Sequence, residues 1–402
     1  MKKKLFALFL AGMMILSLVA CTEANPSTDS GIDTNPVSNT SSVRTETDAV
    51  TDSASDVSSD ASTDTSSDLQ QSTDSATQTS SDLSDESQDV EKPFGFDPDL
   101  EHKVILTDNT HAAIVVLDLN KSDMKNVDWR TDTSLAEAII YTMNYGMDSA
   151  KYRYSPYYQQ DIIVATSSEG YLYVYEYNPK ENSYQRLLFV FDCKANEQEI
   201  SLYNAHSAEM LPNGDIVVAT SGYQKDGDGS NYRNGGIHYY PAGSNKRSAF
   251  LSLPFAHAAV WDDKNQCLWA IGFEGIVAIK INGSGENVTL EKIEGKGYKA
   301  KSAFRGHDMV PAFGMDGKYW VSEEEGVYLF DTANNTLTKA EQYSYDKIKG
   351  MAYFADGTMI MSDWTKYLLT HVVDPATQKT TATPCAIKNQ VYKINVFTKN
   401  YS

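Results

Sequence analysis

The chain has 402 residues and a formal net charge of −20, from 54 acidic and 34 basic residues. Residues 22–92 hold 16 of the acidic and 2 of the basic residues, and three more lysines occupy positions 2–4, so 38 acidic and 29 basic residues remain in 93–402. This mildly acidic remainder excludes a basic groove for nucleic acid and a polybasic patch for a membrane surface.

Residues 1–20 predict a secretory signal peptide. Three lysines precede an apolar run over residues 5–20, and the run is shorter than the roughly 20 residues that a membrane-spanning helix needs. The segment Leu18-Val19-Ala20-Cys21 resembles the lipobox of bacterial lipoproteins, which implies cleavage before Cys21 and lipidation of that cysteine. We therefore expect a lipid-anchored protein on the extracellular side of a bacterial cell membrane. The alternative is an ordinary secretory signal with a chance cysteine.

Residues 21–92 predict a disordered linker. The segment is dominated by Ser, Thr and Asp, has no aromatic residue, and carries self-repelling negative charge, so it cannot build a core. We expect it to hold the domain of residues 93–402 away from the membrane.

Residues 93–402 contain a repeat of about 50 residues. Three copies begin at His206, His257 and His307, in steps of 51 and 50 residues, and a fourth copy without the histidine begins at Lys349. Asn-Gly or Asp-Gly pairs separate apolar runs rich in Val, Ile, Tyr and Trp, which is the strongest short-range signal for a hairpin. The pattern predicts an all-β fold, a β-propeller of about six four-stranded blades, with residues 390–398 pairing with the first blade.

Three segments carry a family resemblance: HSAEMLPNGDIVVATSG, AHAAVWDDKNQCLWAIG and GHDMVPAFGMDGKYWVSEEEGVYLFD. They resemble a family of bacterial secreted and lipoprotein propellers of uncharacterised function (DUF6528-like), over nearly all of residues 100–402. The resemblance implies a fold and no reaction. In architecture alone, the histidines on inner strands are also distantly similar to propeller polysaccharide lyases such as oligogalacturonate lyases, which bind a metal through a histidine cluster.

The repeat predicts that His206, His257 and His307 share one level around the axis, because equivalent residues of successive inner strands form a ring. Three imidazoles can bind a divalent metal such as Zn, Mn or Ca and can also act in catalysis. In the alternative interpretation, they form hydrogen bonds between blades. Tyr223 is a candidate for proton transfer, and Arg305 for neutralising a substrate carboxylate. The remaining candidates for ligand binding are Arg233, Tyr152, Arg153, Glu209 and Asp308.

Three functions stay open from the sequence. The first is binding of an extracellular ligand, above all a glycan, at the mouth of the channel. The second is a metal-dependent polysaccharide lyase or hydrolase that uses the histidine cluster, and the third is a non-catalytic scaffold for a surface protein. The sequence leaves enzyme activity undecided, and we expect a monomer that binds no nucleic acid and meets the membrane only through its lipid.

Overall fold

The computed structural model describes residues 102–109, 113–119, 128–131, 146–168, 170–179, 187–192, 204–224, 232–233, 235–343, 347–363, 368–373, 380–381 and 391–401. These residues belong to the unit Asp85–Ser402. The predicted signal peptide, Cys21 and the predicted linker lie outside them.

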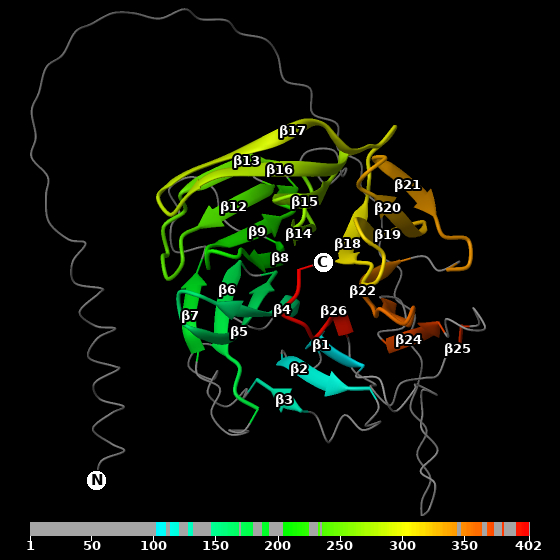
Figure 1. Ribbon diagram of the computed structural model, residues 1–402, viewed down its shortest axis with the longest axis horizontal. Coiled ribbons are helices and arrows are strands. Elements are labelled where there is room, and N and C mark those ends of the chain that lie inside the picture. Colours follow the sequence, from blue (N-terminus) through cyan, green and yellow to red (C-terminus); the bar gives the residue numbers. More distant parts are fainter. Residues whose placement is uncertain are drawn as a thin grey trace, which may run out of the picture. The chain divides into compact units, whose positions relative to one another are not determined.

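The described strands form six four-stranded antiparallel sheets and one two-stranded sheet, arranged around a common centre (Figure 1). The first three sheets, written from the inner strand outward, are β26 (Val391–Val396), β1 (Lys103–Asp108), β2 (Ala113–Asp118) and β3 (Trp129–Arg130); β4 (Met147–Ser155), β5 (Gln160–Ser167), β6 (Tyr171–Glu176) and β7 (Leu187–Asp192); and β8 (Ala205–Met210), β9 (Ile216–Thr220), β12 (Gly236–Tyr240) and β13 (Ala249–Ser252).

The next three sheets follow in chain order around the ring. They are β14 (Ala258–Asp262), β15 (Cys267–Gly272), β16 (Gly275–Ser284) and β17 (Asn287–Lys299); β18 (Gly306–Pro311), β19 (Lys318–Glu323), β20 (Gly326–Asp331) and β21 (Thr336–Lys339); and β22 (Ile348–Tyr353), β23 (Met359–Asp363), β24 (Leu368–Val373) and β25 (Thr380–Thr381). The two-stranded sheet pairs β10 (Tyr223–Gln224) with β11 (Tyr232–Arg233).

The inner strands contact one another in the order β4, β8, β14, β18, β22 and β26, and β26 contacts β4. The ring is therefore closed, and its closure joins the two ends of the domain, because β26 pairs with β1. Such pairing covers sheet edges that would otherwise be open to aggregation. The all-β propeller predicted from the repeat is confirmed, as is the pairing of the C-terminal strand with the first sheet. No helix among the described residues is long and apolar enough to cross a membrane.

The core consists of apolar layers between neighbouring sheets. Strands such as β2 (AIVVLD) and β15 (CLWAIG) are apolar almost throughout because both of their faces are covered by adjacent sheets. The tight turns have the chemistry that their sequences predict: Gly214 and Gly357 adopt φ values of 91° and 92°, a left-handed conformation that glycine tolerates best.

The inner strands carry an irregularity near their first residues. The antiparallel register shifts between Met147 and Ser149, and again in β8, β18 and β22, so one residue of each of these strands is skipped by the pairing. The skipped residues are Asp148, His206, His307 and Lys349. A bulge of this kind redirects the side chain that it carries.

Candidate functional site

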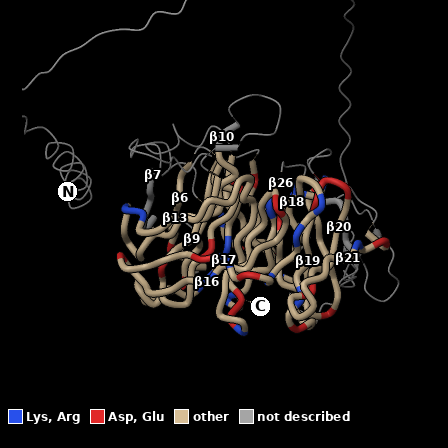
Figure 2. The backbone as a smooth tube through the Cα atoms, turned by 90° about the horizontal axis from the view of Figure 1, so that it is seen from above, with Lys and Arg blue, Asp and Glu red and all other residues tan. Residues whose placement is uncertain are grey.

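Six side chains meet at the end of the axis where the inner strands begin. Each four-stranded sheet contributes one of them, from its inner strand or from the residue just before that strand. We call this set the histidine ring; it comprises Asp148, His206, His257, His307, Lys349 and Tyr392. The inner strands run away from this end, and the C-terminal end of the chain lies on the other face of the domain (Figure 2). Four of the six are the skipped residues of the inner strands, so the bulges position the ring.

The three predicted histidines are in contact with one another. The rings of His206 and His257 stack with centroids 4.1 Å apart and planes 14° apart, and the ring of His307 meets that of His257 edge-on at 5.5 Å. The Nδ1–H of His257 donates to the carbonyl oxygen of Phe255 at 3.1 Å. The prediction that the three histidines share one level is confirmed.

Burial keeps these imidazoles neutral. All three are at most 9% exposed. Burial lowers the pKa of His206 to about 3, and Lys393 and Lys349 add to that shift. The pKa of His257 is also well below its usual range because of burial and the neighbouring His206, and that of His307 is lowered by burial and Lys349. A neutral imidazole offers one donor and one acceptor nitrogen, so each histidine can still bind a ligand by hydrogen bonds.

The other three members of the ring add groups that titrate or donate protons. Burial raises the pKa of Asp148 to about 7, against the hydrogen bond that the Ser168 hydroxyl donates to it at 2.6 Å. Burial lowers the pKa of Lys349 to about 8, and its Nζ donates to Nε2 of His307 at 2.8 Å. The Tyr392 hydroxyl lies 3.4 Å from Nδ1 of His206. The ring therefore holds a cation and a carboxyl group that both change charge near neutral pH.

The ring does not have the donor geometry of a metal centre. The stacked rings of His206 and His257 lie in nearly parallel planes, so their in-plane lone pairs do not converge on one point. Among the residues that the structure describes, no group of three or more His, Cys, Asp or Glu side chains is placed to hold a metal ion. The use of His206, His257 and His307 as metal ligands stays a prediction.

Beneath the ring, Lys393 connects two inner strands to β26. Its Nζ lies 3.2 Å from Oδ1 of Asp308 and donates to the carbonyl oxygen of His257 at 2.8 Å. The lysine is 1% exposed. Asp308, a predicted ligand-binding residue, is thus an ion-pair partner inside the domain, and its pKa is raised by burial even though Lys393 opposes the shift.

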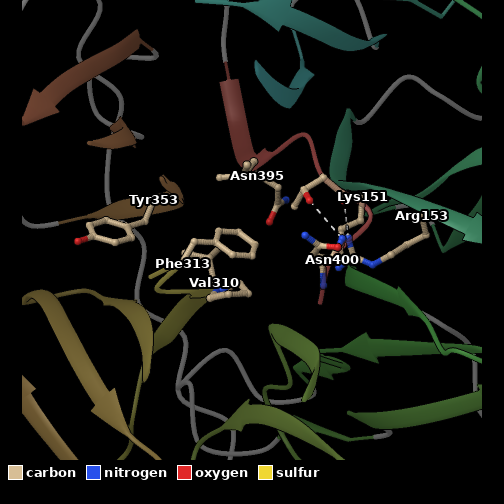
Figure 3. A pocket seen from close by; sticks show the side chains of 10 residues that line it. Lys151, Arg153, Val310, Phe313, Tyr353, Asn395 and Asn400 are labelled. Atoms are coloured by element: carbon tan, nitrogen blue, oxygen red, sulfur yellow. Dashed lines mark hydrogen bonds between the residues drawn. The ribbon is translucent and has the colours of Figure 1, made fainter. Parts of the chain in front are cut away.

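The opposite end of the axis, which we call the tail end, is closed by a different set of charges. The guanidinium of Arg153 donates to both carboxylate oxygens of Glu209, at 2.8 and 3.1 Å, and Nζ of Lys151 donates to the same carboxylate at 3.0 Å. Glu209 has no exposed surface. Arg153 also donates to the carbonyl oxygen of Thr398, so this network fastens the C-terminal residues (Figure 3). Glu209 and Arg153 thereby lie at the other end of the axis from the histidine ring. The sequence pattern did not distinguish these two locations.

The remaining predicted residues belong neither to the histidine ring nor to the charge network of the tail end, or their side chains lie outside the described residues. Tyr152 is buried and stacks on Phe397 with centroids 4.0 Å apart, so its ring packs in the core. Arg305 is exposed and donates to Glu324 at 3.2 Å. Tyr223 pairs with Arg233 between β10 and β11, and their side chains lie outside the described residues, as does Cys21.

One family of proteins matches most of the chain. A family of unknown function, DUF6528, matches residues 75–382. The chain belongs to this family.

Solved structures with low sequence identity align with this DUF6528 protein. They include a chain from the crystal structure of a nidogen–laminin complex (9% identity, TM-score 0.45, covering 75% of this chain and 100% of that chain) and a functionally unknown protein from Desulfotomaculum acetoxidans (12%, TM-score 0.42, 74% and 100%). Apo AztD from Citrobacter koseri aligns with 11% identity and a TM-score of 0.38, covering 73% of this chain and 97% of that chain. No curated protein matches.

Sequence reasoning missed three members of the ring in this DUF6528 protein: Asp148, Lys349 and Tyr392. A short sequence pattern does mark these positions. It consists of segments of four consecutive residues: an apolar residue, the ring residue, a variable residue, and another apolar or small residue. These segments are Met147-Asp148-Ser149-Ala150, Ala205-His206-Ser207-Ala208, Ile348-Lys349-Gly350-Met351 and Val391-Tyr392-Lys393-Ile394. The pattern is short, so it identifies ring positions only once the strands are known.

Proposed function

We propose that this protein binds an acidic extracellular glycan at the histidine ring. The observation that carries the proposal is Lys349, a partly buried cation whose Nζ is held by a neutral imidazole, that of His307. Among the described residues, no carboxylate lies within ion-pair distance of this ammonium group, unlike the other buried lysines of the axis. The carboxylate of a uronic acid unit would supply the ion-pair partner for this ammonium group.

The other members of the ring fit the same ligand. Neutral His206 and His257 supply hydrogen-bonding nitrogens for sugar hydroxyls, and Tyr392 supplies a hydroxyl group. Asp148 opposes an anion when it is ionised, and its raised pKa keeps it protonated in mildly acidic solution. Binding is therefore strongest below pH 7 and weakens as the pH rises through about 8, where Lys349 loses its proton.

The proposal places the domain on the outer face of a bacterial membrane, attached through a lipid on Cys21. Support comes from the lipobox-like segment at 18–21 and the acidic, aromatic-free linker that follows it. Replacement of Cys21 by Ala is expected to abolish labelling by radioactive palmitate and to move the protein from the membrane fraction to the soluble fraction. Membrane retention of an unlabelled Cys21→Ala protein contradicts the anchor.

The glycan proposal is tested by calorimetric titration with oligogalacturonate, and with its methyl ester as a ligand of the same shape without the charge. We expect wild-type protein to bind the acid and not the ester. Lys349→Met is expected to weaken binding by about tenfold or more, since a hydrogen bond to a charged group contributes about 1.5–3 kcal/mol. Lys264→Met removes an exposed lysine and serves as the matched control.

Equal affinity for acid and ester, or equal affinity of the wild-type and Lys349→Met proteins, contradicts the proposal. The metal-dependent alternative has a separate test, elemental analysis of the purified protein before and after chelation. One equivalent of Zn, Mn or Ca that is lost when His206, His257 and His307 are all replaced by Ala favours a metal enzyme. A protein without metal leaves binding as the function to pursue.

A further inference from the structure

A recess opens at the tail end, on the face opposite the histidine ring. Its walls are the turn after β18, which carries Phe313, the turn after β22, which carries Asp356, and the C-terminal residues, which contribute Thr398 and Asn400. The recess has a volume of about 270 Å³. A smaller cavity of about 20 Å³ adjoins it through shared walls and reaches Lys151 and Arg153. Figure 3 shows Phe313 facing Lys151 and Asn400 across this cavity.

The apolar part of the recess is aromatic. Phe313 is half-buried and so presents part of its ring, whereas Phe354 is buried and packs edge-on against His102 with centroids 4.9 Å apart. A sugar ring has an apolar face of C–H bonds that packs on an exposed aromatic surface. Small-molecule sites combine such a surface with a few polar groups in fixed positions.

The polar part of the recess is held in place by the fold. Nε2 of His102 lies 2.8 Å from Oδ2 of Asp356, and the same carboxylate accepts hydrogen bonds from the backbone and hydroxyl of Thr358 at 2.9 and 3.0 Å. Opposite it, the backbone N–H of Asn400 donates to the Thr398 hydroxyl at 3.2 Å, and the Asn400 residue is exposed. A carboxylate, a hydroxyl and an amide are groups that accept from and donate to sugar hydroxyls.

The charge around the recess disfavours an anion. The two cations at its base, Lys151 and Arg153, both bind the buried carboxylate of Glu209, and Asp356 places a negative charge at the rim. The volume lies just below the usual range of about 300–1,000 Å³ for ligand pockets, so it suits one ring and no larger group.

The C-terminal wall is a strap that crosses the tail end. Arg153 binds its Thr398 carbonyl at 3.0 Å and lies over the ring of Tyr401 at 4.7 Å, and Lys399 pairs with Asp161 at 2.8 Å. The strap is thus fastened on both sides of the wall residues Thr398 and Asn400, so the recess is formed before any ligand arrives. From this geometry we propose that the recess is a second ligand site, one that binds the neutral, hydroxyl-rich ring of a single sugar unit.

The site is tested by saturation-transfer NMR on the purified protein with glucose, galactose, mannose and N-acetylglucosamine, each at millimolar concentration. We expect transfer to at least one of these sugars, and we expect Phe313→Ala and Asn400→Ala each to weaken its binding by about tenfold. Tyr157→Ala removes a different exposed aromatic residue and should leave the signal unchanged. Thermal unfolding of each variant shows whether it remains folded.

The proposal is overturned by an absence of transfer to all four sugars, or by equal transfer to the wild-type, Phe313→Ala and Asn400→Ala proteins. The proposal also stands apart from the one made for the histidine ring. Lys349→Met, which is expected to lose oligogalacturonate, should keep the neutral sugar, because the two sites lie at opposite ends of the axis. Loss of both ligands in this single variant contradicts the existence of a separate site.

Discussion

At the histidine ring, burial keeps three imidazoles neutral and leaves Lys349 facing one of them, whereas at the tail end Lys151 and Arg153 both bind the carboxylate of Glu209. Both cations of the tail end thus have an ion-pair partner within the fold, and removing that partner would leave them buried and uncompensated. At the histidine ring, Glu324 stabilises the charge of Lys349 only from beyond ion-pair distance, and we propose that an acidic ligand compensates that charge. This contrast is the physical basis for assigning an acidic ligand to one end and a neutral ligand to the other.

The largest change in stability is expected when the buried carboxylate of the tail end is removed. Glu209→Gln leaves two buried cations, each 6% exposed, without their carboxylate partner, and we expect it to lower the free energy of unfolding by about 3–5 kcal/mol. Urea denaturation measures this change. Glu274→Gln, which breaks a partly exposed pair with Lys292, should cost about 0.5 kcal/mol or less. Equal losses in the two variants would show that burial does not distinguish them.

A second test concerns the carboxyl group of the histidine ring. The pKa of Asp148 is raised in the folded protein to about 7, so its stabilising contribution is complete below about pH 4 and is lost as the pH rises to about 7. Asp148→Asn does not ionise and avoids this loss. We expect its stability relative to wild type to grow across that window by about 2–4 kcal/mol in total, measured by urea denaturation at several pH values. A difference that is constant with pH contradicts the burial of this carboxyl group.

For the histidines, stability changes with pH in the opposite direction. The pKa of His257 is lowered in the folded protein, so its contribution is present above about pH 6.5 and is lost as the pH falls, because only the unfolded chain takes up the proton. His257→Asn removes this titrating group while its amide can still donate to the Phe255 carbonyl oxygen. We expect the variant to lose less stability on acidification, by up to about 1.4 kcal/mol per pH unit below pH 6.5. Parallel stability curves for variant and wild type would mean that His257 takes up a proton as readily in the folded protein as in the unfolded chain.

The sequence predicted the propeller because every sheet except the first is built from strands that are close together in the sequence. Three hairpins that each follow a histidine recur in steps of 51 and 50 residues, and two of them have an Asn-Gly or Asp-Gly turn, so they need no information about distant partners. The same regular spacing predicted the three histidines. It could not locate Asp148 or Tyr392, because the segments that connect their sheets differ in length, so neither residue falls at the repeat distance from a histidine.

Contacts between distant segments account for the rest of what the sequence did not yield. The bulges that aim Asp148 and Lys349 depend on the pairing register of adjacent strands. Tyr152 looked like a ligand-binding residue because its partner Phe397 lies at the other end of the domain sequence. Arg153 and Glu209 belong to the tail end because each inner strand runs through the domain, so residues a few positions after a ring residue reach the opposite face.

The smallest change in stability is expected at the C-terminal strap. The Tyr401 ring lies under the guanidinium of Arg153 at 4.7 Å and packs against a core cluster with residues from β9, β12 and β14 to β17. Tyr401→Leu keeps an apolar side chain and removes the cation–π contact, which contributes about 0.5–1 kcal/mol at a partly exposed position. We expect a loss of that size in urea denaturation, and no loss from the same substitution when Arg153 is already replaced by Met, because the two residues then no longer interact. If Tyr401→Leu costs the same in both backgrounds, Tyr401 is held by packing alone, and Arg153 fastens the strap only through the Thr398 carbonyl oxygen.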